Sequence, residues 1–195
     1  MKETSKYKSS FTSGDLLQEE IVTILNRIDL NNIFKNNFDK TTIVLKSKSE
    51  HTQIRIINEA LRRIKTVENN EVWDFFLHAS DQNQKLILFY AILISYDLVL
   101  EFVLEVFHEK ILNFQDKLTK SDFYSFLEEK SRTHPELESK PEESIKKIQR
   151  STFHVMRQIG ILKRNTIQSI TIDDNLKKLF NSMGEGWFIE VLPKN

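Results

Sequence analysis

The sequence contains no cysteine, only 4 glycines and only 3 prolines in 195 residues. Without cysteine the chain can form no disulfide framework, thiolate metal site or thiol nucleophile. The few glycines leave little material for a phosphate-binding loop, and no Walker A, G-x-G-x-x-G, H-E-x-x-H or G-x-S-x-G motif occurs. We therefore expect an ordered, mainly α-helical protein that is not an enzyme and that uses no cofactor or small-molecule substrate.

The sequence also lacks an apolar run long enough to cross a bilayer. The longest run, Leu86–Tyr96, is well short of the roughly 20 residues required. Four carboxylates then recur at every fourth residue, namely Asp97, Glu101, Glu105 and Glu109. We interpret 85–112 as a buried core helix pair that breaks at 95–97, where Asp97 can cap the second helix. The N-terminus is polar and basic, with no signal-peptide pattern, so we expect a cytoplasmic protein without a membrane partner.

A metal site is not expected either. Glu105 and His108 have the Glu-x-x-His spacing of di-iron helix bundles, but such a site needs this pair twice and the chain has it once. A solvated acidic helix face explains the spacing better. The histidines at 51, 78, 134 and 154 are scattered, as is usual for surface or capping residues.

Hydrophobic periodicity and capping residues predict the remaining elements. Helices are expected over 11–28, 47–64, 69–79, 121–130, 141–159 and 173–183, with a shorter one within 29–40. Ser47, which has capping-box spacing to Glu50, and Ser121 are the expected caps of two of these helices. Segment 41–45 fits either a strand or the approach to a helix, whereas 166–172 and 187–192 are expected to be short strands that pair. The organisation predicted is a helical bundle over 1–131 around the central apolar helix pair, a linker over 132–143, and a winged-helix-like subdomain over 144–195 packed on the bundle. That subdomain would contain the small two-stranded β element.

Charge is balanced in total, with 28 basic and 28 acidic side chains, but it is unevenly distributed. Acidic residues dominate the middle of the chain, and both ends are basic. This separation says more about binding partners than the neutral total does.

The first basic stretch accompanies the helix expected over 47–64. Its inner face is assigned to Ile54, Ile57, Leu61 and Ile64. Its cations are Lys46, Lys48, Arg55, Arg62 and Arg63, the last of them placed on the solvent side. Glu59 lies among these cations and can pair with Arg55 or Arg63, so an ordinary solvated face explains the pattern equally well.

The second basic stretch lies on the helix that Pro141 begins and Gly160 ends. Its inward stripe is Ile145, Ile148, Thr152, Val155, Met156 and Ile159. Its outer face carries Lys146, Lys147, Arg150, His154 and Arg157, and the turn that follows adds Lys163 and Arg164. No acidic residue interrupts the sequence from 144 to 172, which favours a binding face over a merely solvated one.

Cations aligned on one helix face suit a duplex nucleic acid, because binding depends chiefly on neutralising phosphates. Six such contacts would give log K a slope of about −5 against log salt on B-form DNA. Arg150 and Arg157 are the candidates for reading base edges, since a guanidinium can bind guanine through two hydrogen bonds.

The order of these segments resembles the BrxA family of BREX bacteriophage-defence systems. The segments that carry the resemblance are FTSGDLLQEE, KSKSEHTQIRIINEALRRI, EFVLEVFHEKIL, SDFYSFLEEK and SIKKIQRSTFHVMRQIGIL, within 11–192. The resemblance implies a compact helical fold, similar in part to the NusB-type fold, with winged-helix character and DNA binding through the two basic stretches. It carries no enzymatic motif. This chain departs from it in being rich in lysine and asparagine and neutral overall.

We therefore predict a double-stranded DNA-binding protein of a phage-defence system, with other proteins of that system as further partners. Two alternatives remain open. One is an RNA-binding module, although RNA reading usually needs exposed aromatic side chains and most aromatics here have core spacing. The other is an assembly subunit that binds a basic partner through its acidic row. A hydrolase is a more distant third possibility.

Overall fold

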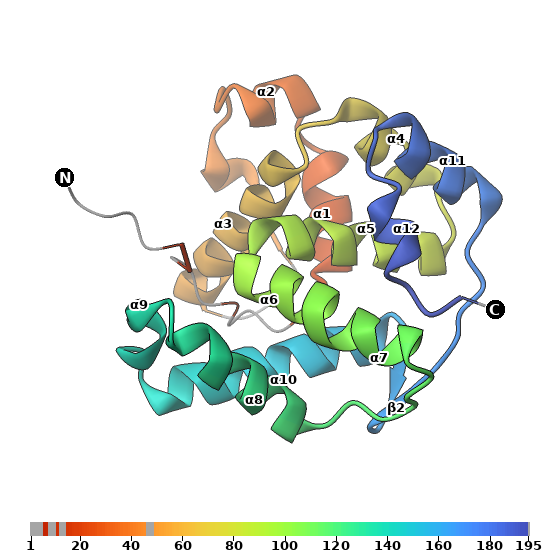
Figure 1. The fold of residues 1–195 in the computed structure, drawn as a ribbon. Helices are drawn as coiled ribbons and strands as arrows, with labels where there is room; N and C mark the ends of the chain where they lie inside the picture. Colours follow the sequence, from red (N-terminus) through yellow and green to blue (C-terminus); the bar gives the residue numbers. More distant parts are fainter. Residues whose placement is uncertain (1–5, 8–10, 12–14, 46–48, 195) are drawn as a thin grey trace. The chain divides into compact units, whose positions relative to one another are not determined.

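The computed structural model describes residues 6–7, 11, 15–45 and 49–194 (Figure 1). The fold is mainly helical and includes one two-stranded antiparallel sheet, which confirms the predicted class. The chain divides into two compact units: unit 1 comprises Met1–Asp15 with Tyr96–Asn195, and unit 2 comprises Leu16–Ser95. The segment 132–143, predicted to be a linker, lies within unit 1 and holds the short helix α9 (Pro135–Glu138).

Unit 2 is organised around α5 (Asp81–Ser95), whose residues from Leu86 to Leu93 are all buried. The other elements of the unit are α1 (Gln18–Leu25), α2 (Leu30–Phe34), the 3₁₀ turn η1 (Lys40–Thr42), α3 (Glu50–Thr66) and α4 (Asn70–His78). Helices α1, α3 and α4 pack against α5. A helix that is apolar on all sides needs neighbours on all sides, so α5 forms the core of this unit, as predicted.

Several details of unit 2 differ from the sequence-based expectations. The first helix begins at Gln18 because Leu17 adopts a left-handed conformation with φ 58°. Segment 41–45 is the end of a 3₁₀ turn followed by extended chain. Ile54, expected on the inner face of α3, is 53% exposed, whereas Ile57, Leu61 and Ile64 are buried. The expected cap Ser47 lies outside the described residues.

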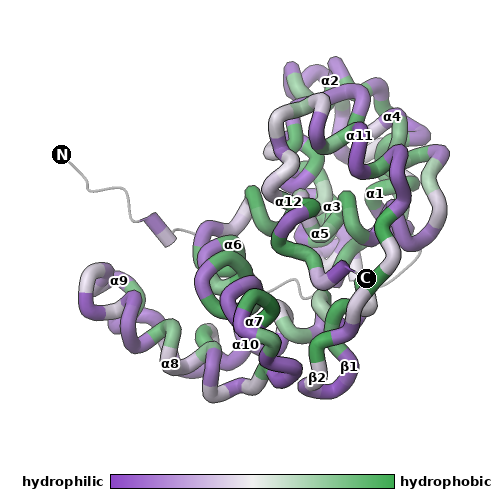
Figure 2. The backbone as a smooth tube through the Cα atoms, turned by 45° about the vertical axis from the view of Figure 1, so that its right-hand side comes forward, coloured by the Kyte–Doolittle hydropathy of each residue, from purple (hydrophilic) through white to green (hydrophobic). Residues whose placement is uncertain are grey.

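Helix α5 ends at Ser95, and the next helix, in unit 1, begins at Asp97. The helical run is therefore interrupted at Tyr96, as predicted. Tyr96, rather than Asp97, is the N-cap of the next helix. The elements that follow are α6 (Asp97–Phe102), the π turn η2 (Val103–Phe107), α7 (His108–Leu112), α8 (Lys120–Ser131), α9, α10 (Glu142–Gln158), β1 (Leu162–Lys163), β2 (Thr166–Ile167), α11 (Asp174–Ser182) and α12 (Trp187–Glu190). Hydrophobic and hydrophilic residues alternate along α6 and α7 (Figure 2).

Phenylalanine rings form the core of unit 1. Phe102 lies 5.0 Å from Phe123 and 6.0 Å from Phe153, measured between ring centroids. These rings join α6, α8 and α10, so the outer faces of α8 and α10 are held on a common support. Chain segment 6–15 belongs to the same unit, where Phe11 is buried against Tyr96 with 4.9 Å between the rings.

The small sheet pairs different segments of the chain from those expected. Strands β1 and β2 pair with each other as an antiparallel hairpin, Leu162 with Ile167 and Lys163 with Thr166. The segment over 187–192, predicted to be a strand, begins with helix α12, which starts in the turn at Gly186. The chain after α7 adds to the hairpin edge, since Lys117 bridges antiparallel to Thr166.

No single helix in the described part of the chain has the length and apolar character needed to cross a membrane. The pair Asp81–Ser95 and Asp97–Leu112 meets those criteria only when joined across its sharp bend at Tyr96.

Candidate nucleic-acid interface

Helix α10 supplies the main face of the candidate interface. Its inward stripe (Ile145, Ile148, Thr152, Val155, Met156 and Ile159) is buried, as predicted. Pro141 stands at the N-cap position, and Gly160, with φ 84°, ends the helix in a left-handed turn. The regular three- and four-residue spacing of the buried stripe fixes the helix orientation, and thereby directs the cations outward.

The outer face of α10 carries exposed cations along most of its length. Lys147, Arg150, His154 and Arg157 are exposed, and Lys146 is partly covered. The side chain of Arg150 is 63% exposed, and its guanidinium donates a hydrogen bond to the Lys146 carbonyl at 3.2 Å. Arg150 and Arg157 therefore face outward, as the sequence analysis required.

The first turn of α10 partly neutralises this face. Lys146 Nζ lies 2.7 Å from Glu142 Oε1 and 3.4 Å from Glu143 Oε1, and Arg150 is 3.7 Å from Glu143 Oε2. Hydrogen bonds to Glu142 and Glu143 raise the pKa of Lys146. The sequence pattern missed this because the acids precede the uninterrupted basic run by one helical turn. The cationic part of the face is therefore its C-terminal portion.

Beside this face lies a groove between α10 and the start of α8. One part, about 500 Å³ in volume, is lined by Lys120, Gln149, Arg150, Ser151, Phe153, His154 and Arg157. A second part, about 280 Å³, shares Lys120, Gln149 and Arg150 and adds Tyr124, Glu143 and Lys146. Lys120 and Tyr124 extend the interface beyond α10. No sequence signal identified them, because their helix is separated from α10 along the chain.

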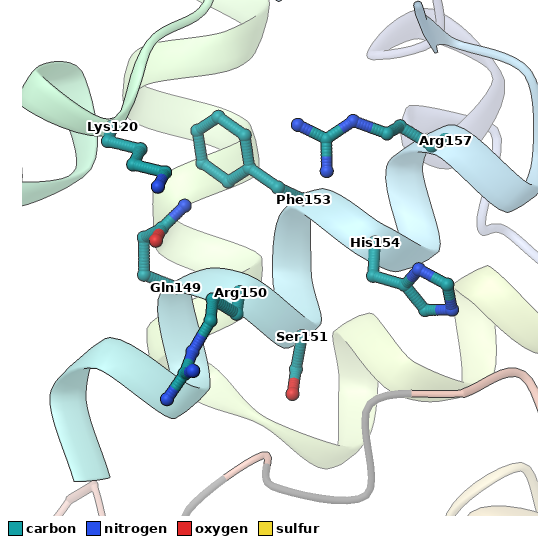
Figure 3. A pocket seen from close by; sticks show the side chains of 7 residues that line it. All are labelled: Lys120, Gln149, Arg150, Ser151, Phe153, His154 and Arg157. Atoms are coloured by element: carbon teal, nitrogen blue, oxygen red, sulfur yellow. The ribbon is translucent and has the colours of Figure 1, made fainter. Parts of the chain in front are cut away.

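The groove side chains point in different directions (Figure 3). Lys120 and Gln149 lie toward each other, and the Arg157 guanidinium is turned toward the Phe153 ring, 5.8 Å from its centroid. Arg150 points away from this group. The cations that a phosphate would contact beside α10 therefore come from two helices, Arg150 from α10 and Lys120 from α8.

Arg157 also couples the helix to the hairpin. Its Nε and Nη2 donate hydrogen bonds to the Arg164 carbonyl at 3.2 and 3.0 Å. Lys163 and Arg164 are both exposed at the turn between β1 and β2, and neither forms an ion pair with any described residue. The predicted cations of α10 and of this turn thus belong to one connected surface of unit 1.

The first basic stretch, in unit 2, is not assembled in the same way. Arg63 is fully buried, so its predicted position on the solvent side is wrong: it pairs with Glu59 at 2.7 Å and donates to the Leu16 carbonyl at 3.0 Å. Arg62 donates to the Ser95 carbonyl at 2.8 Å, and Arg55 is exposed. Lys46 and Lys48 lie outside the described residues. The packing of α1 against α3 widens the buried face and takes Arg63 out of solvent.

Two of the four carboxylates in the acidic row, Glu101 and Glu105, are occupied by cations of unit 1, whereas Asp97 and Glu109 are exposed. Glu101 pairs with Lys6 at 2.6 Å and with Lys130 at 2.7 Å, and Lys130 also pairs with Glu105. Burial alone would raise the pKa of Glu101, but hydrogen bonds from Lys130, Lys6 and Tyr7 outweigh it and lower the pKa to about 2. These carboxylates serve the internal cohesion of unit 1 more than they offer a docking face.

Within the described ranges no cluster of three or more histidine, aspartate or glutamate side chains is arranged to hold a metal ion. Glu105 of the Glu-x-x-His pair is instead bound to Lys130 at 2.6 Å.

Comparisons with known proteins agree with this architecture. The BrxA family model matches residues 5–184. The chain is 24% identical over 194 residues to the BREX protein BrxA of Bacillus cereus (strain H3081.97), covering 95% of this chain and 96% of that protein. It is 22% identical over 152 residues to the BREX protein BrxA of Escherichia coli O9:H4 (strain HS), covering 76% and 71%.

The fold also matches the crystal structure of an uncharacterized protein from Magnetospirillum magneticum. The TM-score is 0.68 at 15% identity, and the match covers 93% of this chain and 94% of the other. That likeness concerns the fold alone, whereas the family model spans most of the sequence. The chain belongs to the BrxA family of BREX defence systems.

Proposed function

We propose that this chain binds double-stranded DNA through the outer face of α10 and the β1–β2 turn, as a non-enzymatic component of its BREX system. One observation carries the proposal. The surface from Lys147 to Arg164 presents cations that are exposed and nearly free of carboxylate partners among the described residues; the exception is the 3.7 Å contact between Arg150 and Glu143. Binding to a polyanion would use this surface without first breaking strong ion pairs.

The order of elements supports a particular mode of binding. Helices α8, α9 and α10 are followed directly by the β1–β2 hairpin, which is the order of a winged helix-turn-helix. In helix-turn-helix proteins the last helix of the motif enters the major groove, and neighbouring segments contact the backbone. In this arrangement α10 would enter the groove, while Lys163 and Arg164 bind phosphates beside it.

Binding to a fluorescent DNA duplex across a salt series tests the proposal. If Lys147, Arg150, Arg157, Lys163 and Arg164 all meet phosphates, the slope of log K against log salt should be about −4.5. The double variant Lys147→Glu/Arg150→Glu should weaken binding roughly 10- to 100-fold at low salt and reduce the slope by about 2. Neither side chain is buried, so the fold should be retained.

The matched control is Lys35→Glu/Lys178→Glu, which changes the net charge equally at two exposed positions that belong to neither α10 nor the β1–β2 hairpin. It should bind nearly as well as the wild type. Equal losses in both double variants would show a nonspecific charge effect and contradict the assigned surface. Competition with single-stranded DNA and structured RNA of the same length separates the RNA-binding alternative, which requires RNA to displace the duplex.

A further inference from the structure

Phe114 is an aromatic residue whose side chain is exposed to solvent and is not packed in the core. It lies two residues after the end of α7, next to the C-cap Asn113, and 97% of its surface is accessible to solvent. Phenylalanine side chains are normally found inside proteins, where their burial stabilises the fold. At this position the ring contributes no such stabilisation.

The backbone at Phe114 is also unfavourable for a phenylalanine. Phe114 has φ 55°, and two hydrogen bonds close the helix end: Phe114 N–H donates to the Ile111 carbonyl and Gln115 N–H to the Lys110 carbonyl. This is a Schellman motif, whose left-handed residue is usually glycine because a side chain is disfavoured there.

The same hydrogen-bond pattern ends three other helices of this chain, at Asn36, Gly160 and Gly184. All three have the residue types that tolerate the left-handed conformation. Two other residues also have a positive φ: Leu17 is buried, so the core compensates for it, and Arg164, with φ 54°, is a polar residue in the exposed turn of the hairpin. Phe114 therefore combines backbone strain with the complete exposure of an apolar ring, a combination that points to a role outside folding.

The loop that carries Phe114 is joined to the candidate DNA-binding surface. Ile167 N–H donates to the Asp116 carbonyl and Leu118 N–H donates to the Asn165 carbonyl, both at 2.8 Å. Lys117 Nζ also donates to Thr166 Oγ1 at 2.7 Å. The hairpin in turn is held to α10 through Arg157, so Phe114 is fixed on the same support as the cations.

The surroundings of Phe114 favour a nucleic acid over a protein as its partner. Two cations, Lys163 and Arg164, are exposed on the adjoining hairpin. Two carboxylates are also near the loop: Asp116, which lies 3.7 Å from Lys117, and Glu109 on α7, which is exposed. An obligate protein interface buries a large and mainly apolar surface. Near this loop, only Leu112 accompanies Phe114 as a large exposed apolar side chain in the described sequence.

We propose that Phe114 inserts as a wedge between base pairs of the DNA duplex that α10 binds, unstacking one step and bending the helix axis. This inference rests on the proposed DNA binding. Apolar side chains that enter the minor groove act in this way, and a rigid, exposed ring close to phosphate-binding cations has the required properties. An α-helix fits the major groove, so the loop beside it would meet the neighbouring minor groove.

The test uses the full chain and a duplex that contains 2-aminopurine at successive positions and a fluorophore at each end. Wild-type protein should raise the aminopurine fluorescence at one step and shorten the end-to-end distance. Phe114→Gly should abolish both signals and weaken binding by roughly tenfold, with the salt slope unchanged. Glycine suits the left-handed position, so this variant should melt at or above the wild-type temperature.

Two further variants sharpen the result. Phe114→Trp should restore the fluorescence rise, because a larger ring can fill the same step. Ile54→Ala removes another exposed apolar side chain, 53% accessible, from unit 2 and should leave both signals intact.

Three outcomes would overturn the inference. If the wild type binds duplex with the expected salt dependence but neither unstacks nor bends it, the wedge is wrong and DNA binding stands. If Phe114→Gly keeps both signals, another residue produces them. If the wild type binds no duplex at any salt concentration, both proposals fail together, and the binding isotherm alone reveals it.

Discussion

Glu101 illustrates how a single residue links pH to the stability of unit 1. Its carboxylate accepts from Tyr7 at 2.8 Å and pairs with Lys6 and Lys130, and its pKa falls from an ordinary 4.5 to about 2. A lowered carboxyl pKa stabilises the folded state fully above the unfolded value, and this stabilisation is lost as pH falls through the folded value. The contribution amounts to at most about 3 kcal/mol.

We therefore expect Glu101→Gln to lower the free energy of unfolding at neutral pH and to flatten its decline between about pH 4.5 and 2. Urea denaturation at a series of pH values measures both effects. Glu128→Gln is the control, since Glu128 is exposed and makes only a 3.8 Å contact with Arg132. A Glu101→Gln variant with the same acid dependence as the wild type would contradict this assignment.

Arg63 shows why individual residues resist prediction from sequence. Arg55 and Arg63 occupy the same helix, eight residues apart, yet one is exposed and the other fully buried. The carbonyl that receives the Arg63 guanidinium belongs to Leu16, 47 residues away, and no local pattern reveals it. The local partner Glu59, four residues before Arg63, was foreseeable from helix geometry, and the pair forms.

Among the helices, α8 begins with a capping box that differs from the predicted cap. Asp122 N–H donates to Thr119 Oγ1, and Thr119 N–H donates back to Asp122 Oδ2 at 2.6 Å. Ser121, the predicted cap, lies in the first turn of the helix instead. The overlooked signal was aspartate in place of the usual glutamate three residues after the threonine.

Thr119→Ala should therefore destabilise the protein by about 1 kcal/mol, because two N–H groups at the start of α8 lose their partners. Ser121→Ala is the matched control at an exposed position and should change the stability by less than about 0.5 kcal/mol. Urea denaturation at neutral pH distinguishes them. If the two variants lost equal free energy of unfolding, or if Ser121→Ala lost more, Ser121 and not Thr119 would be the cap.

Helices with regular patterns were predictable, and segments with short or borderline patterns were not. The buried stripe of α10 was identified residue by residue, since periodicity is a local property of the sequence. In contrast, 187–192 has strand-like composition but begins with helix α12, because hydrogen bonds to the Gly186 carbonyl start a helical turn. The cations of α10 were correctly placed outward, whereas the groove residues Lys120 and Tyr124 depend on packing between helices.

For the whole molecule, the division of the chain into units depends on contacts that are distant in sequence. Segment 6–15 belongs with 96–195: Tyr7 bonds to Glu101, Gln158 donates to Asp15 at 2.7 Å, and Phe11 packs on Tyr96. The two prolines between 132 and 143 suggested a boundary by composition. Composition cannot show that Leu137 is buried or that α9 packs on α8 within one unit.

This arrangement predicts where a core mutation near the N-terminus takes effect. Phe11→Ala should cost about 3 kcal/mol, since the ring is almost completely buried against Tyr96. Hydrogen exchange followed by mass spectrometry should then show faster exchange in α6 of unit 1 before any change in α3 of unit 2. Val72→Ala, a buried substitution in unit 2, is the reciprocal control and should affect α4 first. If Phe11→Ala instead leaves α6 protected and accelerates exchange in α3, then segment 6–15 stabilises unit 2, and its assignment to unit 1 is wrong.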